Sequence, residues 1–74
     1  MTKKNIKINL LGFKCPLPVL KANHLIKQYS NGDIIEIAVD DKAAPEDFKV
    51  YCDTKHYELI SIEEDEYIKI KIKI

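Results

Sequence analysis

Hydrophobic and polar residues alternate along this chain with two different periods. In Ile6–Leu10 and Tyr67–Ile74 they alternate at every second position, which predicts strands that bury one face. The β-branched run Ile34–Val39 has the composition of a central strand, and Tyr57–Glu63 is predicted to be a further strand. In the last strand the isoleucines are expected to point inward and the lysines outward: Ile68, Ile70, Ile72 and Ile74 against Lys69, Lys71 and Lys73.

Between the strands the period changes to that of a helix. Pro18–Tyr29 places its apolar residues on one face at about 100° per residue, and this helix is expected to begin at or just after Pro16. It ends at the turn residues Ser30–Asp33. A second helix is predicted over Ala43–Lys55, with Pro45 in its first turn. The expected buried faces are Val19, Ala22, Leu25, Ile26 and Tyr29 in the first helix, and Ala44, Phe48, Tyr51 and Cys52 in the second.

The elements therefore follow the order β-α-β-α-β-β. Because strand–helix–strand units are right-handed, both helices are expected on one face of the sheet. We predict an α/β (α+β) two-layer sandwich, with a four-stranded mixed sheet, in a single domain over residues 1–74. Both helices then begin at the same end of the sheet as Cys15. Asp40 and Asp41 are expected at that end too, as N-caps of the second helix.

The composition mainly excludes classes of function. The 74 residues contain 12 lysines, no arginine and 12 acidic residues, so the formal net charge is zero. This balance argues against direct binding to nucleic acid or to an anionic membrane, both of which need clustered positive charge. No apolar segment approaches the ~20 residues that cross a bilayer. No spacing typical of metal ligands occurs, so neither a metal nor a cofactor is expected. Two cysteines are too few for a disulfide framework, which favours the reducing cytoplasm.

The segment Gly12–Pro18 carries the candidate chemistry. Prolines are tolerated in the first turn of a helix, so Cys15 is expected at the N-cap or one residue before it. There the positive end of the helix dipole and the neighbouring Lys14 both favour the thiolate over the thiol. We therefore interpret Cys15 as a reactive thiolate. The alternative is that Cys15 is a small buried hydrophobic residue, as free cysteines often are.

The surrounding sequence limits what this thiol can do. Pro18 stands where a Cys-x-x-Cys pair would have its second cysteine, and His24 lies about two helical turns away, too far to act as a base. Cys52 is expected near the other end of the molecule, beyond the reach of a disulfide to Cys15, and is interpreted as a structural residue. A single exposed thiolate of this kind suits carrying a group covalently and passing it to another protein.

These residues resemble the small sulfur carrier proteins of the TusA (SirA-like) family over nearly the whole chain. Leu11–Lys14 is similar to the family's Leu/Arg-Gly-Leu-Arg lead-in, and Cys15–Pro18 matches its Cys-Pro-x-Pro signature. Asp40–Ala44, followed by Asp47-Phe48, looks like the family's Asp-Asp-x-Ala-Ala-x-x-Asp-Ile. Glu58-Leu59 fits the Glu-Leu that opens its third strand.

The resemblance implies the βαβαββ sandwich and a role for Cys15 as a persulfide carrier. A cysteine desulfurase or other persulfide donor would load sulfane sulfur onto Cys15, and a downstream acceptor protein would receive it, as in tRNA 2-thiouridine synthesis. Other members serve molybdenum cofactor assembly, sulfur oxidation, or thiosulfate and selenium use. The chain is expected to be a monomer. The residues that support the motif are Gly12, Lys14, Pro16 and Pro18.

Three positions depart from the family pattern. Leu17 stands where members that serve tRNA thiolation typically carry Glu, which leaves the downstream route open. Lys14 replaces the usual Arg. The family's Gly-His before Glu-Leu is replaced by His56-Tyr57, so His56 is expected at a positive φ.

Leu17 and Leu20 fall off the buried face of the first helix, at angles near Lys21 and His24. Exposed leucines beside a reactive sulfur would form a docking patch, with Lys21 as a further contact, for a partner that must bring its own cysteine close. An equally weighted alternative is that Leu17 tucks under the loop at Gly12 and that Leu20 is an ordinary surface leucine.

Two other functions remain open from the sequence. One is a non-catalytic regulatory or protein-interaction module of the same fold, in which Cys15 only packs. The other is a thiol-redox enzyme that reduces peroxides, which the missing resolving cysteine disfavours. The sequence also leaves open whether this protein should be called an enzyme, since a carrier turns over only together with its partners. The lysines of the last strand, with Lys7, are interpreted as protecting an edge of the sheet.

Overall fold

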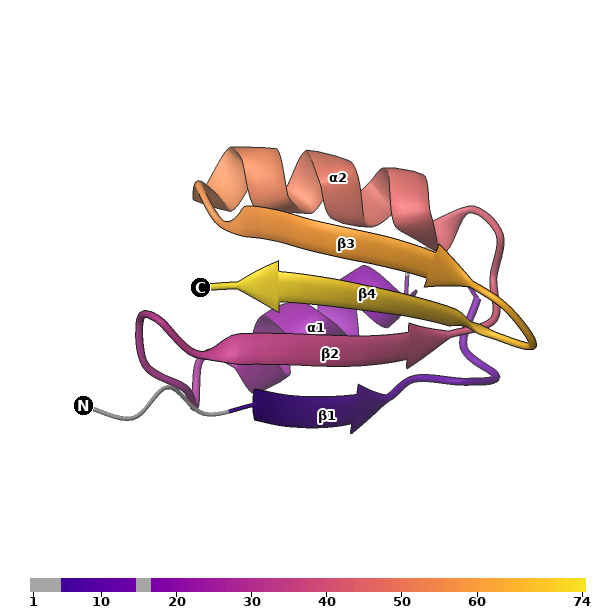
Figure 1. The fold of residues 1–74 in the computed structure, drawn as a ribbon, viewed down its shortest axis with the longest axis horizontal. Helices are drawn as coiled ribbons and strands as arrows, with labels where there is room; N and C mark the ends of the chain where they lie inside the picture. The colour runs from indigo at the N-terminus through magenta and orange to yellow at the C-terminus, as the bar shows by residue number, and fades with distance from the viewer. Residues whose placement is uncertain (1–4, 15–16) are drawn as a thin grey trace.

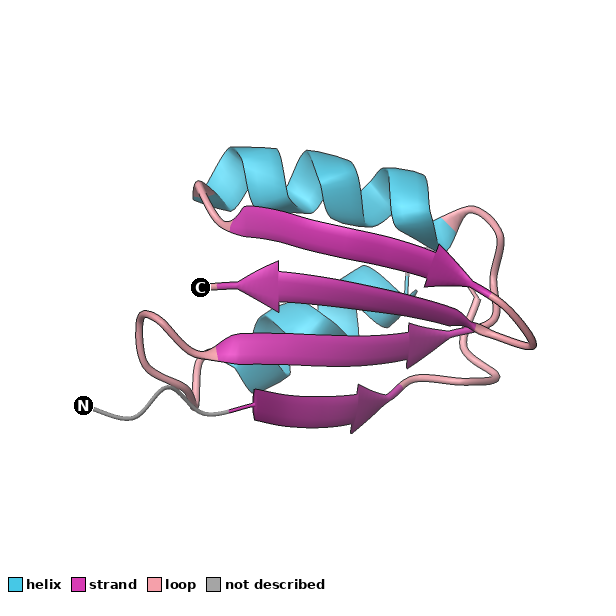
Figure 2. Cartoon of the chain, viewed as in Figure 1, coloured by secondary structure: helices cyan, strands magenta, loops and turns pink. Residues whose placement is uncertain are grey.

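The computed structural model describes residues 5–14 and 17–74 of the chain. Figures 1 and 2 show the predicted βαβαββ order, which is confirmed. Within the described part of the chain, no helix is long and apolar enough to cross a membrane. The elements are β1 (Asn5–Asn9), α1 (Leu17–Ile26), β2 (Ile34–Val39), α2 (Ala44–Lys55), β3 (Glu58–Glu64) and β4 (Ile68–Lys73).

The strands form a mixed sheet in the order β1-β2-β4-β3. β1 is parallel to β2, whereas β4 is antiparallel to both of its neighbours. Both helices cover one face, as predicted, and their buried side chains meet those of the strands in one core. The largest fully buried side chains are Phe48, Ile35, Ile37, Ile70, Ile72, Val39 and Pro18.

The lysines of β4 lie on the open face of the sheet, but not at its edge. β4 lies between β2 and β3, so the interpretation of these lysines as edge protection is wrong. Opposite charges at facing positions of neighbouring strands favour their pairing. The lysines therefore support the pairing of a central strand. Each stands opposite an acidic residue: Lys69 opposite Glu63, Lys71 opposite Glu36, and Lys73 opposite Glu58.

α1 ends earlier than predicted. It stops at Ile26, although the hydrophobic pattern continues to Tyr29. The N–H groups of Gln28 and Tyr29 donate to carbonyls three residues back, at 3.1 and 3.0 Å, so the chain tightens after the helix. The Oδ2 of Asp33 then accepts a hydrogen bond from the N–H of Ser30 at 3.1 Å. This local bonding competes with a further helical turn.

The ends of α2 confirm one prediction and correct another. His56 follows the helix with φ at 61°, the positive value expected there. At the start, the N-cap residue Ala43 makes no side-chain capping bond, and its N–H donates to the Oδ1 of Asp41 at 2.9 Å. The prediction that Asp40 and Asp41 are the N-caps of this helix is wrong, because the helix begins later and its N-cap is Ala43. The carboxylate of Asp40 accepts a hydrogen bond from the N–H of Gly12 instead.

Both helices begin at the same end of the molecule, as predicted. This end lies on the right in Figure 1, where β1 and β2 also finish and where the turn between β3 and β4 lies. Two connections therefore meet there, one from β1 to α1 and one from β2 to α2. The described part of the Gly12–Pro18 segment belongs to this end of the molecule.

Candidate functional site

The candidate site is the segment between β1 and α1. Cys15 and Pro16 lie outside the described residues, so the predictions about them are not tested by the structure. On either side of them, the N–H of Leu17 donates to the carbonyl oxygen of Lys14 at 2.8 Å. Lys14 is exposed, and α1 begins at Leu17, which agrees with a start just after Pro16.

Hydrogen bonds tie the start of this segment to the sheet. The N–H of Leu10, the residue after β1, donates to the carbonyl oxygen of Ala38 in β2 at 2.8 Å. The next N–H, that of Leu11, donates to the side-chain Oδ1 of Asn9 at 2.9 Å. Leu10 is buried while Leu11 is exposed. The chain therefore leaves the core at this point along a defined path.

Gly12 joins the segment to the end of β2. Its N–H donates to the Oδ2 of Asp40 at 3.0 Å, across 28 positions of sequence. Its φ is +88°, in the left-handed region that side chains disfavour. Asp40 follows Val39, which is fully buried, so the accepting carboxylate extends from the end of a packed strand.

Phe13 and Lys21 link the segment to α1. The Nζ of Lys21 lies 4.7 Å from the centroid of the Phe13 ring, within the range of a cation–π interaction. Phe13 is half-buried and packs against the core. Lys21, the predicted partner contact, is exposed, and its charge lies beside the segment that leads to Cys15.

The leucines predicted as a docking patch are exposed. Leu17 and Leu20 expose 45% and 58% of their surface, so the alternative in which Leu17 tucks under the loop is wrong. Pro18, by contrast, is buried and anchors the first turn of α1. The two leucines and Lys21 border one shallow hollow of about 290 Å³, whose other lining residues are His24 and Leu25.

The sequence prediction missed the part of this surface that α2 contributes. Leu20 also borders a second hollow, of about 340 Å³, between the two helices. Val50 of α2 lines it and exposes 64% of its surface. The signal in the sequence was an apolar residue off the buried face of the second helix. We call the two hollows together the helix groove. The second hollow is lined by Val19, Leu20, Asp47, Val50, Tyr51 and Thr54.

The second cysteine, Cys52, lies in the core on the buried face of α2. Cys52 is buried, as predicted, and burial raises the pKa of its thiol to about 11. Its neighbour Tyr51 donates a hydrogen bond from its hydroxyl to the Oδ1 of Asn23 at 3.0 Å, which joins α2 to α1. Burial, followed by the nearby Tyr57, raises the pKa of Tyr51 to about 12. Both groups stay protonated at neutral pH.

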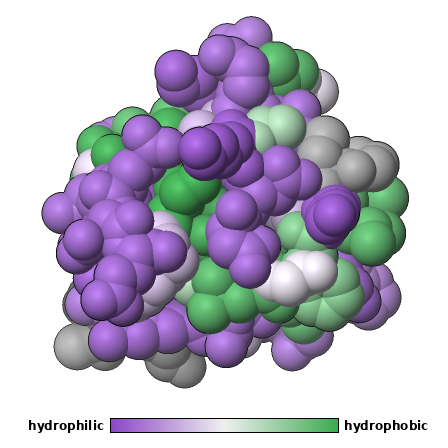
Figure 3. Space-filling model, turned by 90° about the vertical axis from the view of Figure 1, so that its right-hand side faces the viewer, coloured by the Kyte–Doolittle hydropathy of each residue, from purple (hydrophilic) through white to green (hydrophobic). Residues whose placement is uncertain are grey.

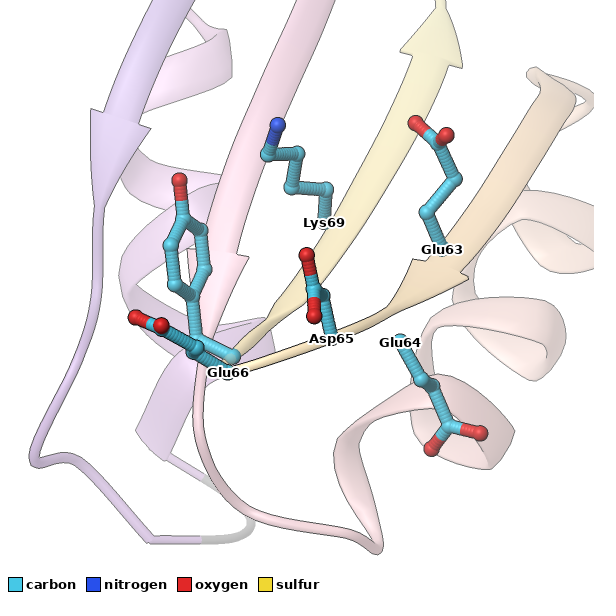
Figure 4. Close-up of a pocket in the computed structure, with 6 residues that line it drawn as sticks. Glu63, Glu64, Asp65, Glu66 and Lys69 are labelled. Atoms are coloured by element: carbon cyan, nitrogen blue, oxygen red, sulfur yellow. The ribbon is translucent and has the colours of Figure 1, made fainter.

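A third hollow lies at the turn between β3 and β4. Figure 4 shows its acidic side chains pointing in different directions, with Glu64 and Glu66 turned to opposite sides. Among residues 5–14 and 17–74, no group of three potential ligands is arranged to hold a metal ion.

Figure 3 views this end of the molecule and shows green hydrophobic surface interrupting the hydrophilic atoms. Polar side chains thus surround apolar patches at this end.

The fold and the described part of the site define a small two-layer α/β protein whose β1–α1 segment is held at one end of the sheet. A SirA-like protein from Desulfitobacterium hafniense has the same fold. It superimposes with a TM-score of 0.80 at 22% identity, over 92% of this chain and 95% of that protein. At this identity the likeness shows the fold alone.

Comparison with protein families carries the assignment further. Residues 6–74 match the model of the family described as Sulfurtransferase TusA. A Neisseria meningitidis protein named "Putative sulfur carrier protein" is 37% identical over 59 residues, which cover 78% of this chain and 80% of that protein. A protein of the same name from Archaeoglobus fulgidus is 34% identical over 70 residues, or 92% of this chain and 91% of that protein. The chain belongs to the TusA family, and the predicted resemblance is confirmed.

Proposed function

We propose that this protein is a sulfur carrier that holds sulfane sulfur as a persulfide on Cys15. The Cys15 thiolate attacks the terminal sulfur of a persulfide on a cysteine desulfurase or another donor. A new S–S bond forms on Cys15, the donor's S–S bond breaks, and the donor cysteine leaves as a thiolate. An acceptor protein's thiolate then takes the terminal sulfur in the same way. Each step exchanges one S–S bond for another, so no outside oxidant or reductant is needed.

The observation that carries this proposal is the family match over residues 6–74, which includes the Cys-Pro-x-Pro segment. A sulfur carrier needs a thiolate that a partner can reach. Of the two cysteines in the chain, Cys52 is buried and has a raised pKa, so it is unsuited to this exchange. Cys15 follows Lys14, which is exposed, and precedes the exposed Leu17.

The helix groove is the proposed docking surface for donors and acceptors. Leu17, Leu20 and Lys21 border it on α1, and Val50 borders it on α2. Exposed apolar side chains of this size favour a protein partner over a small ligand. The groove begins at the first residues of α1, so a partner bound there would bring its own cysteine toward position 15. Such a relay requires reduced thiols and is proposed for the cytoplasm, with tRNA 2-thiouridine synthesis as one route for the sulfur.

The proposal is tested by intact mass spectrometry after incubation with a cysteine desulfurase and cysteine. The wild type is expected to gain one sulfur atom, and a reductant is expected to remove it. Cys15→Ser should gain nothing. Cys52→Ala should gain the sulfur like the wild type. Alanine is the better substitution at position 52, because serine would bury a hydroxyl in the core.

Two results would contradict the proposal. A sulfur gain that persists in Cys15→Ser would move the carrier function away from this residue. Binding of the wild type to the desulfurase with no sulfur gain, together with a Cys15 thiol protected from alkylation, would instead favour a non-catalytic interaction module.

A further inference from the structure

The hydrogen bond between Gly12 and Asp40 connects the segment before Cys15 to the rigid part of the sheet. It spans 28 positions of sequence, so it is a tertiary contact rather than a local turn. The acceptor is a carboxylate oxygen at 3.0 Å, and hydrogen bonds from backbone N–H groups to carboxylates are stronger than those between neutral groups.

The two sides of this bond differ in rigidity. Asp40 follows β2, whose Val39, Ile37 and Ile35 are fully buried, so its backbone is fixed by the core. Gly12 is exposed, and a Cβ placed on it would meet no atom within 4 Å. Packing therefore does little to hold the backbone at Gly12. The hydrogen bond to Asp40 supplies a restraint that packing does not.

The neighbouring Asp41 contacts the start of α2. Its Oδ1 accepts a hydrogen bond from the N–H of Ala43, and its carbonyl oxygen accepts one from Ala44 at 3.0 Å. These contacts order the start of α2. These contacts of Asp41 lie at the start of α2, whereas Asp40 accepts its hydrogen bond from the β1–α1 segment.

We propose that Asp40 is a positioning residue for sulfur transfer, which holds the Gly12–Lys14 backbone in place for the cysteine that follows it. This inference rests on the proposed function of Cys15. Sulfur exchange requires a nearly linear approach of three sulfur atoms, and small displacements in such steps reduce the rate strongly. Asp40 acts through the backbone, so the presence of a hydrogen-bond acceptor matters more than the negative charge, which only strengthens the bond.

The first test measures the restraint itself. Hydrogen–deuterium exchange of the Gly12 amide, followed by NMR, should be about tenfold faster in Asp40→Ala than in the wild type. Asp40→Asn keeps a carbonyl oxygen in the same place and should retain most of the protection. Asp53→Ala is the control, because Asp53 is an exposed aspartate of α2, and it should leave the exchange of Gly12 unchanged.

The second test measures sulfur loading by a cysteine desulfurase in a single turnover, over a range of desulfurase concentrations. Asp40→Ala should lower the loading rate at saturation on the order of tenfold, with the half-saturating concentration unchanged. Asp40→Asn should restore the rate. A merely structural role would lower the melting temperature without this separation of rate from affinity.

The outcomes separate the two proposals. Loading of the wild type together with an unchanged rate in Asp40→Ala overturns the positioning role and leaves the carrier function intact. A rate as low in Asp40→Asn as in Asp40→Ala also overturns it, because the charge would then be the active feature. Failure of the wild type to load contradicts the carrier function itself, and with it the role of Asp40 in transfer.

Discussion

The chemistry of a thiol depends on how easily it forms a thiolate, and Cys52 forms one with difficulty. Cys52 lies on the buried face of α2, where desolvation disfavours the charged form and raises the pKa to about 11. Loss of the proton from a thiol in this position would lower the free energy of unfolding. The chain therefore contains its own internal control for any experiment on Cys15.

This property of Cys52 predicts how stability depends on pH. The pKa of the thiol is 9.0 in its ordinary state and about 11 in the folded protein, so the folded state holds the proton more tightly. The stabilisation that this protonated thiol contributes to the folded state is fully present below about pH 9 and is lost as the pH rises through 11. A tenfold change in proton affinity corresponds to about 1.4 kcal/mol, so about 2–3 kcal/mol of the free energy of unfolding depends on this proton.

Urea denaturation between pH 7 and 11 checks this expectation. Tyr51, whose pKa is also raised, contributes a decrease in the same direction at still higher pH. The Cys52→Ala variant is expected to lose less stability than the wild type between pH 9 and 11. Equal losses in the two proteins would show that the thiol does not titrate as argued.

At the scale of elements, the order of strands and helices could be predicted from the sequence, because strands show a hydrophobic period of two residues and helices a period of 3.6. It did not predict that β4 lies between β2 and β3. Strand order depends on how a hairpin docks, and alternation in Ile68–Lys73 is the same for a central or an edge strand. The facing acidic residues Glu36, Glu58 and Glu63 come from two other strands, so their pairing becomes visible only in the sheet.

In the candidate site, too, some features could be predicted from the local sequence and others could not. The helix start after the prolines and the exposure of Leu17 and Leu20 follow from local rules of helix geometry. The hydrogen bond from the N–H of Gly12 to Asp40 and the contribution of Val50 to the helix groove do not follow from local rules, because each joins residues that are far apart in sequence.

The end of α2 provides a prediction at this scale. His56 adopts φ at 61°, which costs a side-chain-bearing residue about 1 kcal/mol relative to glycine. His56→Gly is therefore expected to raise the free energy of unfolding by about 0.5–1 kcal/mol in urea denaturation. Lys49→Gly, at an exposed position in the interior of α2, should lower it by about 1 kcal/mol because glycine weakens a helix interior. A loss of stability in His56→Gly would mean that the histidine side chain makes a contact worth more than the strain.

At the scale of the whole molecule, the end of the sheet that holds the β1–α1 segment is continuous with the helix groove. One side of the protein thus presents both the proposed transfer site and the proposed docking surface. The open face of the sheet carries facing charges instead, and a hollow on this face is bordered by charged side chains that include Lys7, Glu36 and Lys69.

This arrangement predicts that groove substitutions weaken binding without changing the chemistry. Leu20→Ser and Val50→Ser should each raise the half-saturating concentration of the desulfurase about five- to tenfold, with the saturated loading rate retained. Ile60→Ser is a matched control, because Ile60 is an exposed hydrophobic residue, 41% exposed, on β3 outside the groove. Equal effects of all three substitutions would argue against the groove as the docking surface.

The central claim is that Cys15 carries sulfane sulfur, and cyanide tests it without any acceptor protein. Cyanide attacks the terminal sulfur of a persulfide, the S–S bond breaks, thiocyanate leaves, and the cysteine returns as a thiolate. After loading and removal of the donor, the wild type and Cys52→Ala should each release about one thiocyanate per chain. Cys15→Ser should release none. Release from Cys15→Ser, or its loss in Cys52→Ala with the fold intact, would contradict the account.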